Sequence, residues 1–129
     1  EEVLFNRAEA NAMLDNNDDV VKELNNYLST RIPDYDPANP AHQLTVQKAT
    51  DYYEGMSTKG ALVSTILNFK QQEYMHEGLR WFDILRHKLP VEHTSFDGKT
   101  TYKLTSEDPR KIQQLPKEAI ANGLASNPR

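Results

Sequence analysis

Apolar residues recur at helical spacing in residues 1–30, and this spacing is the strongest constraint on what the chain can fold into. Leu4, Ala8 and Ala12 stand at i, i+4 and i+8 in the segment VLFNRAEANAMLD, which places them on one helix face. The polar run NNDD at 16–19 interrupts this pattern, and a second amphipathic segment follows over 19–30. Two amphipathic helices joined by a short polar turn predict an antiparallel helical hairpin over 1–30. The hairpin is similar to one tetratricopeptide unit, but no second copy follows at a fixed period.

Composition excludes several classes of function. The net charge of −4 and the absence of a basic run argue against a nucleic-acid partner, because phosphate neutralisation needs a basic face. The chain has no cysteine, which excludes disulfides, thiolate metal sites and cysteine catalysis. No stretch approaches the roughly eighteen consecutive apolar residues of a membrane span. The sequence opens with helix-forming residues and no Met, so we expect a segment of a longer protein.

The middle of the chain predicts a loop followed by a long helix. Residues 31–58 are expected to be a loop-rich insert, because RIPDYDPANPAHQ contains three prolines and several turn-forming Asp and Asn residues. A short helix stays open within it, where Val46, Ala49 and Tyr53 have helical spacing. Ser57 or Thr58 suits the N-cap of a long helix over 59–89, which Pro90 would end.

The last part of the chain, 91–129, predicts a β-hairpin and a C-terminal tail. Two short runs flank Asp97–Gly98, which is a strong hairpin signal. Pro116 suits the first position of a short helix, and Gly123 suits its C-terminal cap. The predicted fold class is therefore mainly α: a tetratricopeptide-like helical hairpin, one long helix and a small C-terminal β-hairpin.

The run EYMHEGLRWFDILRH, residues 73–87, combines many charges with aromatic residues. Glu73 and His76 have the spacing of a carboxylate-bridged di-iron motif, but only one copy is present. His76–Glu77 begins a zinc-protease pattern, but Arg80 stands where a second His is required. Each acid has a base three or four residues away, so we favour a structural ion-pair network over a pair of catalytic carboxylates. Its predicted members are Glu73, Glu77, Arg80, Asp83 and Arg86.

No residue is predicted to be catalytic, to bind a cofactor or to ligate a metal, and we expect no enzyme. The glycines are too scattered for a phosphate loop, and no serine lies in a nucleophile elbow. A sugar-binding platform is an alternative role for the aromatic residues, although Trp81 and Phe82 lie in an apolar sector and are expected in the core. Tyr35 in the proline-rich loop is the most exposed-looking aromatic and a candidate surface contact. The candidates for the platform are Tyr52, Tyr53, Tyr74, Trp81 and Phe82.

Three segments of the chain resemble the SusD/RagB family. FKQQEYMHEGLRWFDILR resembles the family's signature helix, from which Lys70 and Gln71 depart conservatively. LFNRAEANAML is similar to a helix of the family's tetratricopeptide-like scaffold, and DPRKIQQLPKEAIANGLASNPR is similar to its closing segment. These segments stand in the family's order and span nearly the whole chain. The residues that match the signature are Glu73, Glu77, Gly78, Arg80, Trp81, Phe82, Asp83 and Arg86.

The resemblance implies a function for the protein that carries this chain. SusD-like proteins are surface-exposed, lipid-anchored outer-membrane lipoproteins of Bacteroidetes that capture glycans and are not enzymes. They pass oligosaccharide to a SusC-like TonB-dependent transporter. The resemblance implies that residues 1–129 are a C-terminal, mainly structural segment of the α/α superhelix part, without a cofactor. No sugar-contacting residue follows from it.

Two other functions stay open from the sequence. The first is a stand-alone tetratricopeptide-like module that binds a protein partner, which would need further repeats and a concave groove. The second is a metal-assisted hydrolase, for which the ligand count is too low. We also expect that the segment alone exposes apolar surface that the rest of the protein would cover. Such a surface favours self-association of the segment.

Overall fold

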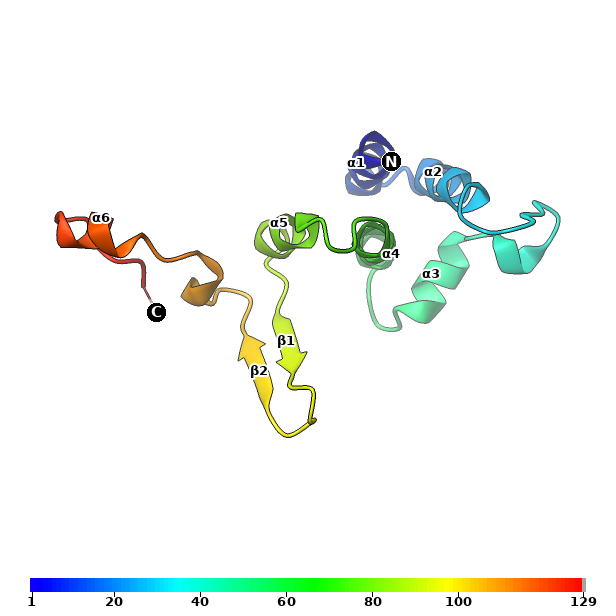
Figure 1. The fold of residues 1–129 in the computed structure, drawn as a ribbon. Helices are drawn as coiled ribbons and strands as arrows, with labels where there is room; N and C mark the ends of the chain where they lie inside the picture. The colour runs from blue at the N-terminus through cyan, green and yellow to red at the C-terminus, as the bar shows by residue number, and fades with distance from the viewer. Residues whose placement is uncertain (129) are drawn as a thin grey trace. The chain divides into compact units, whose positions relative to one another are not determined.

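The computed structural model describes residues 1–128 and is mainly helical, with one small antiparallel sheet (Figure 1). The predicted fold class is confirmed. The chain forms two compact units, the first over Glu1–Met75 and the second from His76 onward. Arg129, the last residue of the predicted 91–129 tail, lies outside the described residues. In chain order the elements are α1 (Glu2–Met13), α2 (Asn17–Ser29), α3 (Val46–Tyr52), α4 (Thr58–Glu73), α5 (Leu79–Arg86), β1 (Val91–Thr94), β2 (Thr101–Leu104) and α6 (Lys117–Ala121), with 3₁₀ turns at Pro40–His42 and Pro109–Lys111.

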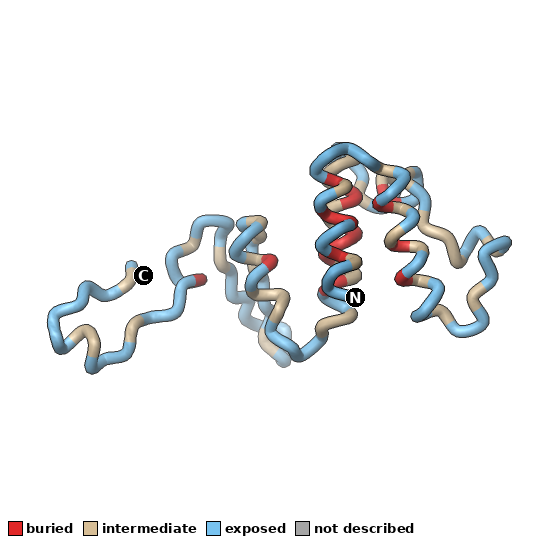
Figure 2. The backbone as a smooth tube through the Cα atoms, turned by 90° about the horizontal axis from the view of Figure 1, so that it is seen from above, coloured by how far each residue is buried: buried red, intermediate tan, exposed pale blue. Residues whose placement is uncertain are grey.

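The first unit is built on the predicted helical hairpin of α1 and α2, against which α4 packs (Figure 1). Most of the buried positions lie on these three helices, as Figure 2 shows. Ala8 and Ala12 are fully buried, and their small side chains let the neighbouring helices approach α1 closely. The core residues of this unit are Phe5, Ala8, Ala12, Val20, Leu24, Tyr27, Ala49, Leu62 and Ile66.

Aromatic rings fill the end of this core that lies near the start of α1. The Phe5 ring lies 5.0 Å from the Tyr27 ring and 6.1 Å from the Tyr74 ring, both measured between centroids. At the opposite end, Lys59 in the first turn of α4 donates to the Met13 carbonyl at 3.0 Å. The start of α4 therefore lies near the end of α1, and the two helices run antiparallel.

The predicted insert over 31–58 contains the short helix α3. Thr45 caps it by accepting a hydrogen bond from the Lys48 amide at 3.1 Å. The Asn25 side chain fixes the preceding loop to α2, because it donates to the Leu44 carbonyl at 3.0 Å and accepts from the Leu44 amide at 2.8 Å. This two-way contact holds the start of α3 beside α2, and α3 itself packs against α4.

The prediction of one long helix over 59–89 is wrong. α4 ends at Glu73 and α5 begins at Leu79, so a turn interrupts the predicted helix. His76 and Gly78 both adopt positive φ, at 69° and 78°. A left-handed residue cannot continue a right-handed helix, and glycine takes this conformation at the lowest cost. α5 also ends at Arg86, before Pro90 is reached. Lys88, two residues after this end, again has positive φ.

The second unit contains the predicted hairpin and the capped C-terminal helix. β1 and β2 pair antiparallel with Val91 opposite Leu104 and Thr94 opposite Thr101. Gly98 has φ 69° within the connecting loop, where a residue without Cβ is favoured. Gly123 follows α6 as predicted, and the amides of Gly123 and Leu124 donate to the carbonyls of Ile120 and Ala119. These two bonds form a Schellman cap.

Replacing the largest fully buried side chain of the first unit tests this packing. We expect Phe5→Ala to lower the free energy of unfolding by about 3–5 kcal/mol, because it removes a fully buried ring and leaves a cavity. Urea denaturation followed by circular dichroism measures the change. Val3→Ala on the exposed side of the same helix is the control and should stay within about 0.5 kcal/mol of the wild type. A cost for Phe5→Ala as small as that of the control would contradict the described core.

Candidate functional site

Glu73, the first member of the predicted network, lies at the end of α4 and binds Tyr27 of α2 and Arg31, which follows α2. Its Oε2 accepts hydrogen bonds from the Tyr27 hydroxyl at 3.0 Å and from Arg31 Nε at 2.8 Å, while Arg31 Nη2 pairs with Oε1. Only 16% of the Glu73 side chain is exposed. A carboxylate held by the two parallel N–H groups of an arginine is among the stronger and more directional ion pairs.

Arg31 links this carboxylate to a second one. Its Nη2 also lies 2.9 Å from Glu1 Oε1, and its guanidinium stands over the Tyr27 ring at 5.3 Å. Glu1 precedes α1, Arg31 follows α2, and Glu73 ends α4, so one cation joins the N-terminal end of α1 to the C-terminal ends of α2 and α4. We call Glu1, Tyr27, Arg31 and Glu73 the Arg31 clamp.

The clamp shifts the pKa values of its members in directions that favour the observed pairing. The hydrogen bonds from Arg31 lower the pKa of Glu73 below its ordinary value, and the two carboxylates raise the pKa of Arg31. Burial and the neighbouring Glu73 raise the pKa of Tyr27 to about 12. All three groups are therefore held in the form that the hydrogen bonds need at neutral pH, which is a structural arrangement rather than a proton-transfer one.

The other predicted network residues do not lie on the same helix as Glu73. Asp83 is buried, and its Oδ1 accepts from Arg86 Nη2 at 2.8 Å, one turn away on α5. Arg80 is partly buried on the same helix. Glu77 is exposed in the turn before α5, and it forms no ion pair with any described residue. Because the helix breaks after Glu73, the predicted ladder is divided between the end of α4 and α5.

The exposure of the aromatic residues differs from expectation. Tyr35 is partly buried, its hydroxyl accepts from Gln43 Nε2 at 2.5 Å, and its ring stacks 6.0 Å from the His42 ring. The expectation that Tyr35 is the most exposed aromatic is wrong, since Tyr52 is 75% exposed. Phe82, expected in the core, is 67% exposed on α5. The predicted role of Tyr35 as a surface contact stays a prediction.

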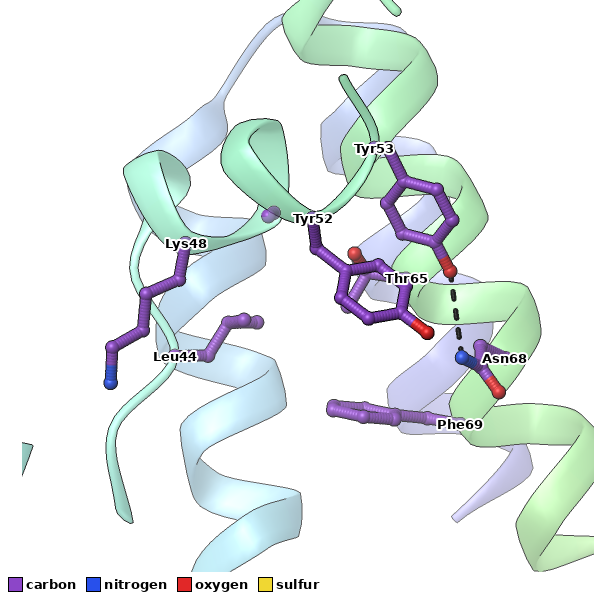
Figure 3. A pocket seen from close by; sticks show the side chains of 8 residues that line it. Leu44, Lys48, Tyr52, Tyr53, Thr65, Asn68 and Phe69 are labelled. Atoms are coloured by element: carbon purple, nitrogen blue, oxygen red, sulfur yellow. Dashed lines mark hydrogen bonds between the residues drawn. The ribbon is translucent and has the colours of Figure 1, made fainter. Parts of the chain in front are cut away.

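A pocket of about 280 Å³ opens between α3 and α4 in the first unit (Figure 3). Tyr52 and Tyr53 reach it from the end of α3, and Phe69 reaches it from α4. The Tyr52 and Tyr53 rings meet edge to face, with centroids 4.8 Å apart and planes at 79°. The Tyr53 hydroxyl donates to the Ser64 carbonyl at 3.3 Å, which ties the pair to α4. The complete lining is Leu44, Lys48, Ala49, Tyr52, Tyr53, Thr65, Asn68 and Phe69.

Sequence reasoning considered Tyr52 and Tyr53 as a platform but did not find the pocket or the clamp. Arg31 lies 42 positions from Glu73, so no helical spacing connects them. The pocket likewise depends on the packing of α3 against α4, which a loop-rich segment does not reveal. The detectable signal was the pair Tyr52–Tyr53 at the end of a short amphipathic run.

The described residues contain no cluster that suits a metal ion. Over residues 1–128, no three His, Asp or Glu side chains gather closely enough to form a ligand set. In the same part of the chain, no helix has both the length and the apolar character needed to cross a membrane.

Comparison with models of known protein families identifies the family of this chain. The SusD family matches over residues 2–122, which includes the clamp residues Tyr27, Arg31 and Glu73 as well as α5 and the hairpin. The chain belongs to the SusD family. No curated protein and no solved structure matches it significantly.

Membership in the SusD family indicates glycan binding in nutrient uptake, because proteins of this family are generally carbohydrate-binding proteins rather than enzymes. The five predicted network residues lie within the matched range. They lie at the end of α4, in the turn after it and in α5, whereas Tyr52, Tyr53 and Phe69 line the pocket between α3 and α4.

The acid dependence of stability tests the clamp. The pKa of Glu73 is lower in the folded chain than in the unfolded chain, so its contribution is complete above the unfolded value of about 4.3 and is lost as pH falls through the folded pKa. We expect Glu73→Gln to cost about 1 kcal/mol at pH 7 and progressively less on acidification. Urea denaturation at several pH values measures this difference.

Glu92→Gln provides a matched control for this experiment. Glu92 pairs with Lys103 at 2.8 Å, but both side chains are more than half exposed. Exposed ion pairs contribute little, so this variant should follow the wild type at every pH. A Glu73→Gln cost that does not change with pH would show that the charge of Glu73 is not what stabilises the fold.

Proposed function

We propose that the chain is the C-terminal segment of a SusD-like cell-surface protein that binds oligosaccharide and delivers it to a SusC-like TonB-dependent outer-membrane transporter. The family match over residues 2–122 is the observation that carries this proposal. The helical hairpin, the signature residues at 73–86 and the closing segment stand in the order that the family shares. In this proposal a lipid anchor holds the protein at the outer membrane of a member of the Bacteroidetes.

Within this function the chain acts mainly as a scaffold. The Arg31 clamp joins the ends of α1, α2 and α4, and Lys59 joins the opposite end of α4 to the turn after α1 through Met13 and Asp15. A scaffold of this kind holds binding loops at fixed positions, which lowers the entropy lost when a glycan binds. The network of Glu73, Glu77, Arg80, Asp83 and Arg86 belongs to this structural role in our proposal, without taking part in chemistry.

A glycan array probed with the native polypeptide that carries residues 1–129 tests the proposed function. We expect binding to a restricted set of oligosaccharides, because a preformed site discriminates by shape and hydrogen bonding. Capture of a TonB-dependent transporter from detergent-solubilised outer membranes tests the delivery step. Absence of binding to every glycan class, together with a partner that is not an outer-membrane transporter, would contradict the proposal.

A further inference from the structure

The pocket between α3 and α4 has the size of a site for one ring. Its volume of about 280 Å³ lies at the lower end of the roughly 300–1,000 Å³ typical of ligand pockets. The walls are largely apolar, with Leu44, Ala49 and Phe69 among them. A pocket of this size holds a single ring-sized group and is too small for several linked rings.

Tyr52 provides an exposed aromatic face that is held in place. Tyr52 is 75% exposed, yet its ring meets the Tyr53 ring edge to face, and Tyr53 is hydrogen-bonded to α4. In Figure 3, Tyr52 from α3 and Phe69 from α4 extend into the same space. A tyrosine loses little conformational entropy when it binds, and prior fixation by a neighbour reduces that loss further.

Polar groups lie beside the aromatic rings. The buried Thr65 hydroxyl donates to the Ala61 carbonyl at 2.8 Å, which leaves its oxygen able to accept another hydrogen bond. Asn68 uses its oxygen toward Gln72 and one N–H toward Tyr53, so its second N–H remains available among the described contacts. The Tyr52 hydroxyl bonds to no described residue. These groups can both donate to and accept from the hydroxyls around a ring.

The charges of the pocket favour a neutral ligand. No carboxylate lines it, and its one cationic side chain is Lys48. The Lys48 ammonium already donates to the carbonyls of Pro40 and Gln43, the latter at 2.6 Å, so it is committed to holding the loop. A ligand with both an apolar face and neutral hydroxyls matches this combination of aromatic rings, amide and hydroxyl groups.

We infer that this pocket is a subsite for one neutral pyranose ring, with Tyr52 as the stacking platform and Asn68 and Thr65 as hydrogen-bond partners. The inference rests on the proposed glycan-binding function and assigns a part of the glycan contact to this segment. The clamp residues lie outside the pocket and take no part in the contact.

Titration of the native polypeptide with maltohexaose, cellohexaose, xylohexaose and mannohexaose tests the subsite. For the hexasaccharide that binds, we expect Tyr52→Ala to raise Kd about tenfold, because an aromatic stacking contact is lost. Tyr52→Phe keeps the ring and should stay within about threefold. Tyr102→Ala, an exposed tyrosine on β2 outside the pocket, is the matched control and should leave Kd unchanged.

Acetylation of tyrosines in the wild-type polypeptide, followed by mass spectrometry, gives a readout that needs no variant. We expect Tyr52 to react in the free protein and to be protected by the bound hexasaccharide, while Tyr102 reacts in both states. Lack of reaction at Tyr52 in the free protein would mean that another part of the polypeptide covers the pocket, and would overturn the inference.

The outcomes separate the subsite from the proposed function. An unchanged Kd for Tyr52→Ala, with a hexasaccharide that binds the wild type, overturns the subsite and leaves the glycan-binding function intact. Failure of all four neutral probes also overturns the subsite, whereas the array, which includes acidic glycans, decides the function separately. A selective loss with Tyr52→Ala and protection of Tyr52 supports the inference.

Discussion

The bidentate pair between Arg31 and Glu73 is the interaction on which the arrangement of the first unit depends. It brings together residues from the ends of α2 and α4, and the same guanidinium reaches Glu1 before α1. Arg31 follows a helix C-terminus and Glu1 precedes a helix N-terminus, so both charges stand at the ends of the helix dipoles that favour them. Directional bonds of this kind fix the angle at which helix ends meet, which apolar packing alone specifies less sharply.

The apolar core and the clamp act on different parts of the same three helices. Ala8 and Ala12 permit close approach along α1, while Phe5, Tyr27 and Tyr74 fill the end next to the clamp. Tyr27 belongs to both, because its ring packs on Phe5 and its hydroxyl donates to Glu73. Tyr27 therefore connects the Glu73 carboxylate directly to the apolar core.

Local patterns predicted the elements that depend on neighbouring residues in the sequence. The spacing of Leu4, Ala8 and Ala12 identified the hairpin, and Gly123 identified a helix end, because each signal acts within one or two helical turns. The break between α4 and α5 was missed, since residues 73–77 are compatible with a helix and only Gly78 indicated otherwise. The partner of Glu73 was missed because long-range pairing leaves no periodic signal.

The division of roles between clamp and pocket follows from their surroundings. Glu73 has its oxygens occupied by Arg31 and Tyr27 and does not line the pocket, whereas Tyr52 is exposed next to polar groups with unused hydrogen-bonding capacity. In our proposal the C-terminal end of α4 carries the scaffold contact, while Thr65, Asn68 and Phe69 earlier in the same helix line the pocket. This division accounts for a charged signature segment in a chain whose family is generally carbohydrate-binding.

A double-mutant cycle of Arg31→Gln and Glu73→Gln, measured both by unfolding and by glycan titration, tests this claim most directly. The account predicts that the two substitutions are non-additive in the free energy of unfolding, because each removes the same pair, and that the glycan Kd of the folded variants is unchanged. Additive effects on unfolding, combined with a loss of glycan affinity in variants that remain folded, would show that these charges serve binding instead of structure.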